Sequence, residues 1–285
     1  KSLMTFYAVL MIFLILAISG SKLGKFEFDK AVNFYSPTKG IYVVDINVKK
    51  CPECIVPYVS NSLETVKSVA EKTNSVAAIN AGFFDPTNTQ TTSYIIENGD
   101  LVADPRNNLN LISNPGIEEY LPAILNRSEF RIANCHLNCD NYSKIYNIAQ
   151  HNDPVEMKCE IIHSIQAGPE LIPDFKLEEE AFVVKKDGKV IRQSAGALGK
   201  YARSAIGIKK DHILLVAVSN ENPMTLEEIA EYMKSLEVDQ ALALDGGSST
   251  SMYVNLPDQP KFVLTSAKDN AARRVKSIIL IKPKT

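Results

Sequence analysis

The residues from Ala241 to Asn255 read ALALDGGSSTSMYVN, and they decide the fold. An apolar run stops at Asp245, two glycines and a series of hydroxyl residues, and an apolar segment then resumes. A short apolar run bounded by glycine is typical of a buried strand, and Gly246 and Gly247 permit backbone conformations that a Cβ would block. The stretch therefore predicts a loop that presents a carboxylate, backbone N–H groups and hydroxyls to one anionic or polyhydroxylated ligand. The alternative is an ordinary polar turn, because Gly and Ser are common turn residues.

A second glycine turn follows the short apolar segment from Val76 to Ile79. In this turn, Gly82 and a pair of phenylalanines lie between Asn80 and Asp85 in the sequence. The amide and the carboxylate are groups that can bind sugar hydroxyls. The alternative for Asn80 is a left-handed turn position, which asparagine tolerates well.

Arg203 lies in the segment YARSAIGI, just before an apolar run. A guanidinium group offers two parallel N–H donors that match the oxygens of a phosphate, although a surface salt bridge is the alternative. We predict that Asp245, Arg203 and Asn80 are the catalytic residues of one pocket for a sugar phosphate. The predicted substrate-binding residues are Gly82, Asp85, Gly246, Gly247, Ser248 and Ser249.

The composition is that of a globular protein without an electrostatic footprint for nucleic acid. The chain has 285 residues, of which 45% are hydrophobic, and a formal net charge of −2. This length supports a well-buried core, and scattered basic residues do not indicate nucleic-acid binding. We interpret the small basic cluster of Arg273, Arg274 and Lys276 as a solvated strand edge.

The N-terminal residues have the pattern of a secretory signal. Lys1 precedes an apolar run from Leu3 to Ile18, and small residues follow it. We predict a signal peptide over residues 1–19, with an uncleaved anchor that attaches the protein to a membrane through residues 3–18 as the alternative. Both interpretations leave residues 20–285 as a secreted or periplasmic domain.

Five cysteines favour an oxidising compartment and disulfide bonds between loops. The CPEC segment resembles a redox motif or half of a zinc site, but no second pair stands at zinc-finger spacing. An odd number of cysteines leaves one thiol without a partner. The cysteines are Cys51, Cys54, Cys135, Cys139 and Cys159.

Local patterns predict several further elements. Strands are expected at 41–48, 76–79, 213–218 and 275–281, and hairpins about Asn98–Gly99 and Asp187–Gly188. Helices are expected where Asn61 with Glu64, and Thr225 with Glu228, form capping pairs. The order strand, helix, strand before Asp245 predicts two parallel strands. Residues 104–153 are rich in Asn and Pro without sustained periodicity, so we interpret them as an insertion or lid.

Other catalytic motifs are absent from the sequence. No lysine follows Gly247 as a phosphate-binding P-loop requires, and the loop GGSSTS does not match a GxSxG nucleophile elbow. The four histidines show no zinc-type spacing, so no cofactor is predicted. A calcium ion held by aspartate and carbonyl oxygens is the open alternative.

Five ordered segments resemble the phosphodiester glycosidase family over about residues 40–283. They are AINAGFF, QAGPELI, ARSAIGI, MTLEEIAEYMKSLE and ALALDGGSSTSMYV. The resemblance implies an α+β fold, with a mixed β-sheet core and flanking helices. It also implies hydrolysis of a sugar that is joined through its anomeric carbon to a phosphodiester. By motif, the polar positions of the family fall on Asn80, Arg203, Asp245, Ser248 and Ser249.

The expected function is therefore hydrolysis of a sugar 1-phosphodiester on an exported glycan, such as an exopolysaccharide, or on a glycoconjugate. We expect Arg203 and the loop N–H groups to hold the phosphodiester, and Asn80 and Asp245 to engage the sugar. One alternative is a non-catalytic module that binds phosphorylated envelope polysaccharide. Another is a transferase that moves a glycosyl group between phosphate acceptors.

Overall fold

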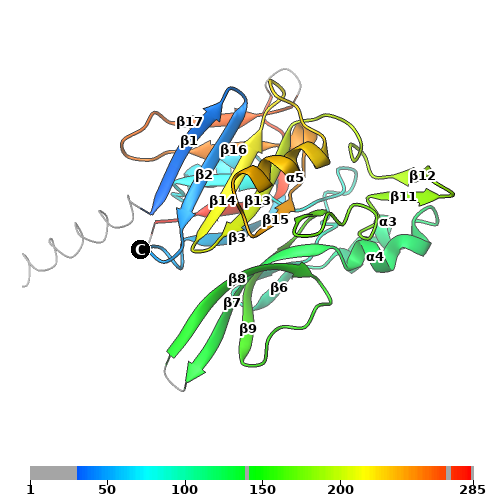
Figure 1. The fold of residues 1–285 in the computed structure, drawn as a ribbon, viewed down its shortest axis with the longest axis horizontal. Helices are drawn as coiled ribbons and strands as arrows, with labels where there is room; N and C mark the ends of the chain where they lie inside the picture. The colour runs from blue at the N-terminus through cyan, green and yellow to red at the C-terminus, as the bar shows by residue number, and fades with distance from the viewer. Residues whose placement is uncertain (1–30, 139–140, 268–270, 284–285) are drawn as a thin grey trace, which may run out of the picture.

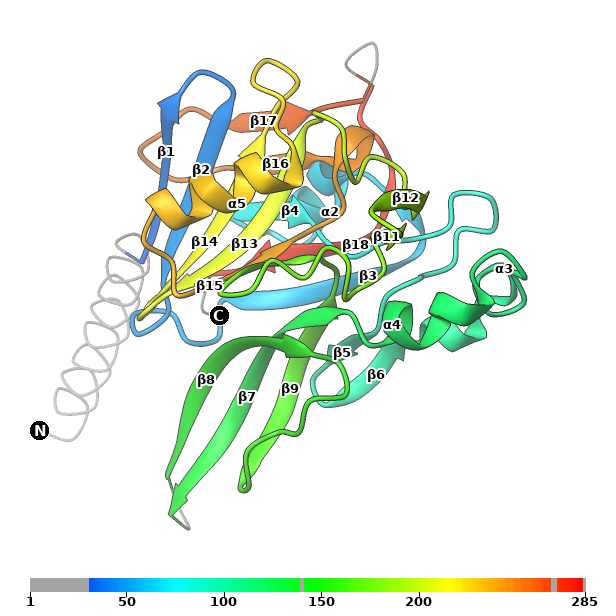
Figure 2. The same ribbon diagram turned by 45° about the vertical axis from the view of Figure 1, so that its right-hand side comes forward.

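Two antiparallel β-sheets pack face to face in the computed structural model, which describes residues 31–138, 141–267 and 271–283 (Figure 1). A third sheet packs its base against the same core, and its long strands project away from the other two sheets (Figure 2). Each of the three sheets contributes buried side chains to the largest hydrophobic cluster. The fold is thus a β-sandwich with a projecting sheet.

The first sheet has six strands, and the second has five. In spatial order the first contains β1 (Val32–Thr38), β2 (Ile41–Asn47), β14 (His212–Val218), β13 (Arg203–Lys209), β15 (Gln240–Ala243) and β10 (Glu170–Ile172). The second contains β17 (Phe262–Thr265), β16 (Ser251–Val254), β4 (Ala77–Asn80), β18 (Val275–Ile281) and β3 (Ile55–Glu64).

The projecting sheet also has five strands, and a separate hairpin lies near it. The projecting sheet contains β6 (Asp100–Ala103), β5 (Ile95–Glu97), β9 (Cys159–Gln166), β7 (Ser128–Asn138) and β8 (Asn141–Gln150). The hairpin consists of β11 (Val183–Lys186) and β12 (Lys189–Gln193). The described α-helices are α2 (Val66–Lys72), α3 (Leu109–Ile112), α4 (Leu121–Leu125) and α5 (Leu226–Ser235), and the 3-10 turns are η1 (Pro105–Asn107), η2 (Glu118–Tyr120) and η3 (Gly247–Ser249).

Strand β14 explains why apolar runs in this sequence are uninterrupted. Successive side chains of a strand point to opposite faces of its sheet. Ile213 and Leu215 therefore enter the core between the sheets, whereas Leu214 and Val216 belong to a second core on the opposite face. Both faces are buried, so no polar residue alternates with the apolar ones.

Helix α5 covers the outer face of the six-stranded sheet. The predicted cap is confirmed, because Thr225 Oγ1 accepts the Glu228 N–H at 3.1 Å and Glu228 Oε2 accepts the Thr225 N–H at 2.9 Å. Its buried side chains Ile229 and Met233 pack in the second core. Strands β14 and β15 both pair antiparallel with β13 between them, so they are parallel to each other, as predicted.

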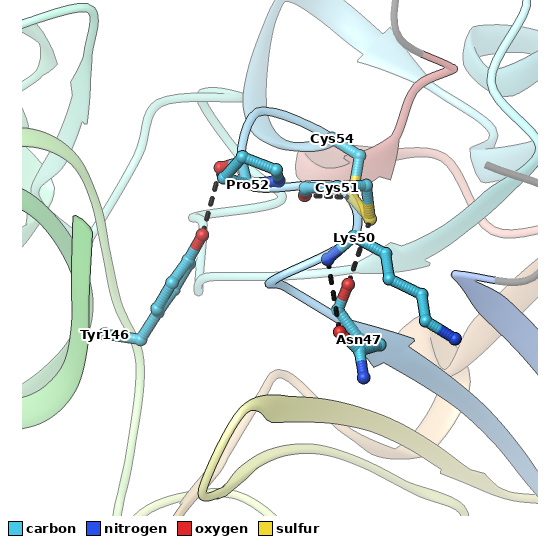
Figure 3. The surroundings of a disulfide bond; sticks show 6 residues. All are labelled: Asn47, Lys50, Cys51, Pro52, Cys54 and Tyr146. Carbon is cyan, nitrogen blue, oxygen red and sulfur yellow. Dashed lines mark hydrogen bonds between the residues drawn. A yellow bond between two sulfur atoms is a disulfide. The ribbon is translucent and has the colours of Figure 1, made fainter. Parts of the chain in front are cut away.

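Two disulfide bonds are present, as the cysteine content predicts. Cys135–Cys159 joins β7 to β9, and Cys51–Cys54 closes the CPEC loop on itself. Figure 3 shows that the Tyr146 hydroxyl of β8 donates to the Pro52 carbonyl oxygen in this loop, at 2.9 Å. The CPEC loop is therefore hydrogen-bonded to the projecting sheet. Cys139 lies outside the described residues.

The expectation of a mixed sheet with flanking helices is only partly correct. Every hydrogen-bonded strand pair among the described residues is antiparallel, and strands far outnumber helices. The physical reason is that β13 inserts between the two strands of the strand–helix–strand unit and takes their hydrogen bonds.

The predicted start of the first helix is wrong. Asn61 belongs to β3, which pairs with β18 as far as Glu64. The helix α2 begins after Thr65, whose hydroxyl accepts the Ser68 N–H at 3.1 Å. Tertiary strand pairing thus overrides the local capping signal, while Val66, Val69 and Ala70 of the helix are buried.

Residues 104–153 are more regular than their composition suggests. They include α3, α4 and the two longest strands of the projecting sheet, β7 and β8. An insertion that acts as a lid stays a prediction. The predicted signal segment lies outside the described residues, and none of the helices in the described ranges is long and apolar enough to span a bilayer.

Replacing Ile229 with alanine is expected to lower the free energy of unfolding by about 2 to 5 kcal/mol, because it opens a cavity beneath α5. Ile229 is fully buried. Urea unfolding measures the change. The control is Glu231→Ala on the exposed side of the same helix, which is expected to change stability by less than about 0.5 kcal/mol. Equal losses in the two variants would contradict the packing described.

Candidate active site

A pocket of about 610 Å³ lies where the glycine loop after β15 meets the start of β13. Three arginines line it, Arg127, Arg203 and Arg273. Among the described residues of its wall, Asp245 is the only acidic side chain. Phe83, Phe84, Phe182 and Tyr201 supply the aromatic surface. The walls therefore carry an excess of positive charge around one carboxylate.

Asp245 occupies the floor of this pocket. The residue keeps some surface toward the cavity, although protein atoms surround its carboxylate. Burial raises the pKa of Asp245 to about 6, while the Ser249 hydroxyl, the positive charge of Arg273 and the Gly246 N–H oppose this shift. The carboxylate is thus mostly ionised at neutral pH, and it can accept a proton slightly below neutrality.

Asn80 lies beneath the pocket and does not line it. Its side chain is fully buried. Its Nδ2 donates to the Asp245 carbonyl oxygen at 2.5 Å, and its Oδ1 accepts the Ser204 hydroxyl at 2.7 Å and the Ser251 N–H at 3.1 Å. Direct binding of a sugar by Asn80 therefore does not agree with its position. The amide instead orients the backbone that carries Asp245.

Arg203 lies in the wall with most of its donors committed to carbonyl oxygens. Its Nε donates to Met224 O at 2.8 Å, and one Nη donates to Gly196 O at 3.0 Å and to Gly199 O at 2.6 Å. The other Nη faces Gly246, where an added Cβ would lie 3.8 Å from it. Burial lowers the pKa of Arg203 to about 10. The residue is still a cation at neutral pH, with one nitrogen available to a ligand.

The glycine loop faces the pocket as predicted. Gly246, Gly247, Ser248 and Ser249 all line it. Gly247 has a φ of 60°, a left-handed conformation that favours glycine, and its N–H donates to Ala202 O at 2.8 Å. Ser249 is buried against Asp245, whereas Ser248 is exposed and free to contact a ligand.

Two predicted binding residues lie away from the pocket. Gly82 is buried, and an added Cβ would lie 2.7 Å from the Gln166 carbonyl oxygen, so this glycine is required for close packing. The Asp85 carboxylate accepts hydrogen bonds from Thr87 and Asn110. These contacts stabilise the turn that follows Phe84, and they orient Asp85 toward its own loop.

The sequence interpretation missed two of the three arginines. Arg273 was assigned to a solvated edge, but it lines the pocket, and its Nε is buried without a hydrogen-bond partner among the described residues. Arg127 comes from the segment without periodicity, just before β7. No local sequence motif marks either residue as a pocket residue, because each reaches the pocket from a distant part of the chain. No group of three or more metal-ligating His, Cys, Asp or Glu side chains occurs in the described ranges.

Together, the fold and the pocket define a strand-rich protein with a cavity lined by three arginines and one aspartate. The sequence matches the profile of the phosphodiester glycosidase family over residues 73–282, and the chain belongs to this family. No protein with a curated description matches the sequence.

Solved structures share the fold at low sequence identity. The catalytic domain of zebrafish N-acetylglucosamine-1-phosphodiester alpha-N-acetylglucosaminidase, auto-inhibited by its pro-peptide, superposes with a TM-score of 0.59 at 16% identity, over 89% of this chain and 82% of that one. A hypothetical protein from Synechocystis superposes with a TM-score of 0.55 at 17% identity, over 87% of this chain and 61% of that one. A protein from Burkholderia pseudomallei superposes with a TM-score of 0.55 at 14% identity, over 87% of this chain and 75% of that one.

The raised pKa of Asp245 makes stability depend on pH. The folded protein holds the Asp245 proton more tightly than the unfolded chain does. Protonation of Asp245 therefore stabilises the fold; this stabilisation is complete below about pH 4 and is lost as the pH rises through about 6. Over this pH range, the free energy of unfolding of the wild type is expected to fall by about 2 to 3 kcal/mol relative to that of Asp245→Asn. Urea unfolding of both proteins at several pH values measures this difference, and a difference independent of pH would contradict it.

Asn80→Ala is expected to lower the free energy of unfolding by about 2 to 4 kcal/mol, because it leaves buried partners in Ser204, Ser251 and Asp245 without a hydrogen bond. Thermal or urea unfolding measures this loss. The control is Asn255→Ala, at the exposed end of β16, which is expected to be close to neutral. A stable Asn80→Ala protein would show that the amide does not hold this loop.

Proposed function

We propose that the protein hydrolyses the glycosidic bond of a sugar 1-phosphodiester carried by an exported glycan or glycoconjugate. The observation that carries this proposal is a pocket with one carboxylate and three arginines, in a chain of the phosphodiester glycosidase family. The pocket volume of about 610 Å³ suits a sugar with its phosphate group.

The single carboxylate favours a phosphate leaving group. Ordinary glycosidases use two carboxylic acids, one of which protonates the departing oxygen. A phosphodiester is already a good leaving group, so stabilisation of its growing negative charge matters more than protonation. Cationic side chains and backbone N–H groups supply this stabilisation. Arg203 and Arg273 offer cationic groups beside Asp245, whereas the N–H groups of Gly246 and Gly247 are committed to Asp245 and to Ala202 O.

In this mechanism Asp245 acts in its ionised form. It attacks the anomeric carbon, activates a water molecule, or stabilises the positive charge of an oxocarbenium-like transition state. Each role requires the carboxylate, and its pKa of about 6 leaves it ionised at neutral pH. Both Ser248, which is exposed, and Phe83 line the pocket, and in this proposal they contact the sugar.

The two disulfides support a secreted or periplasmic location, since such bonds persist in oxidising compartments. Attachment to a membrane through residues 3–18 stays a prediction.

Hydrolysis of a sugar 1-phosphodiester in oxygen-18 water tests the reaction. Attack at the anomeric carbon places the label in the released sugar, which is the expected result. Label in the phosphate would instead make the protein a phosphodiesterase. Binding without turnover would favour the polysaccharide-binding module, and product formation only with an added glycosyl acceptor would favour a transferase. A parallel assay with a chelator tests the calcium alternative.

Asp245→Asn is expected to lower turnover of the same substrate by about a hundredfold to a thousandfold, the range typical of losing one charge-stabilising group. The kcat/KM of the wild type is expected to rise with pH through about 6, as Asp245 ionises. The control is Asp100→Asn, which removes an exposed carboxylate outside the pocket. Near-normal turnover by Asp245→Asn would remove this residue from the mechanism.

A further inference from the structure

The Arg127 guanidinium reaches the pocket from the start of the projecting sheet and keeps most of its donors free. Only 8% of its surface is exposed. Its one hydrogen bond within the described part of the chain runs from Nε to the Glu180 carbonyl oxygen, at 3.1 Å. A guanidinium carries five N–H donors, so the donors on both Nη atoms stay available to a ligand.

Two aromatic rings pack against this guanidinium. The Arg127 Cζ lies 3.7 Å from the centroid of the Phe182 ring and 5.7 Å from that of Phe83. Both rings line the pocket together with Arg127. Stacking on an aromatic face leaves the edges of the guanidinium, where its N–H groups lie, directed away from the ring. The side chain is therefore held in place before any ligand arrives.

The other buried arginines show that this freedom is unusual in the molecule. Arg131, on the strand β7 that follows Arg127, uses Nε and both Nη atoms in bonds to Glu129 and to three carbonyl oxygens. Arg203 uses Nε and one Nη in the same manner. Those two arginines brace the fold, whereas Arg127 has the donor pair that a carboxylate or phosphate accepts in two-point fashion.

No carboxylate of the described residues pairs with Arg127 within ion-pair distance. The nearby Glu180 carboxylate accepts instead from the Ser128 hydroxyl at 2.7 Å. Burial and the charge of Arg192 lower the pKa of Arg127 to about 9, against the opposing effect of Glu180, so it stays protonated at neutral pH. A buried cation without a partner is costly to the fold, and such groups concentrate at functional sites.

Arg127 and Asp245 contact different residues within the pocket. Arg203 and Arg273 are the arginines next to the aspartate loop, through Gly246 and through the Asp245 carboxylate. The neighbours of Arg127 are Phe83, Phe182 and Glu180. The charge on the pocket wall is also larger than one phosphodiester requires, because a phosphodiester and Asp245 neutralise only two of the three arginines.

We propose that Arg127 binds a second acidic group of the substrate, a carboxylate or phosphate on the sugar or on the aglycone. The substrate would thus be an acidic sugar 1-phosphodiester, a conclusion that rests on the proposed function. The phosphodiester lies beside Arg203 and Arg273, and the additional acidic group lies at the free Nη atoms of Arg127, beside the Phe83 and Phe182 rings. Arg127 is then the residue that determines specificity.

The test compares methyl diesters of glucose 1-phosphate with three acidic analogues. These carry a C6 carboxylate, a C6 phosphate, or a carboxylate on the aglycone. A hydrogen bond to a charged group is worth about 1.5 to 3 kcal/mol, so the wild type is expected to prefer one acidic analogue by about tenfold to a hundredfold in kcat/KM. In Arg127→Gln this preference is expected to disappear, chiefly through a higher KM for the acidic substrate.

Two further variants complete the test. Arg106→Gln removes an exposed arginine that does not line the pocket and should retain the preference. Arg127→Lys keeps the charge but loses the two-point geometry, so an intermediate preference is expected, and this variant decides the test if Arg127→Gln does not fold. The proposal is overturned if the wild type has no preference, or if the Arg127 variants lose neutral and acidic substrates equally.

Binding without turnover separates this inference from the proposed function. If the wild type hydrolyses none of the diesters, the proposed function fails, and calorimetric titration with glucuronic acid and with glucose decides the role of Arg127. Binding of glucuronic acid in preference to glucose by the wild type and Arg106→Gln, but not by Arg127→Gln, supports an acid-binding site. Equal binding of the two sugars, or no binding, overturns it.

Discussion

The side-chain amide of Asn80 joins the two sheets of the sandwich at the end where the pocket lies. It receives hydrogen bonds from Ser204 of the six-stranded sheet and Ser251 of the five-stranded sheet, and it donates to the Asp245 carbonyl oxygen. The Asp245 N–H also donates to Ala81 O. The Asp245 backbone is thus held on both sides, and the Ser249 hydroxyl and the Gly246 N–H hold its carboxylate at the pocket.

The electrostatics of the pocket follow from how the arginines are held. Carbonyl oxygens satisfy the N–H donors of Arg203 without cancelling its charge, and an aromatic stack holds Arg127. The positive charge is therefore still available to an anionic ligand. Burial alone would keep Asp245 protonated, but Arg273 and the loop donors limit that shift. The balance leaves a carboxylate that is ionised yet poorly solvated, a state suited to attack or to charge stabilisation.

The projecting sheet lies within the residues that match the family, and it contributes to the pocket. Its strands are anchored by Cys135–Cys159 and by the contact of Tyr146 with the CPEC loop. The same sheet delivers Arg127 to the pocket wall. If Arg127 binds an acidic group as proposed, a segment remote from the aspartate loop contributes to the choice of substrate, while the sandwich holds Asp245.

Local chemistry made much of the fold and part of the site predictable. The β14 run, the cap of α5, both glycine hairpins and the loop from Asp245 to Ser249 follow from short-range spacing and backbone preference, and the ordered motifs indicate the family. Only the tertiary structure placed Asn80 beneath the pocket, since its partner Ser204 is 124 residues away. It likewise brought Arg127 and Arg273 into the wall. The direction of a side chain at a turn depends on distant segments, which local sequence patterns do not encode.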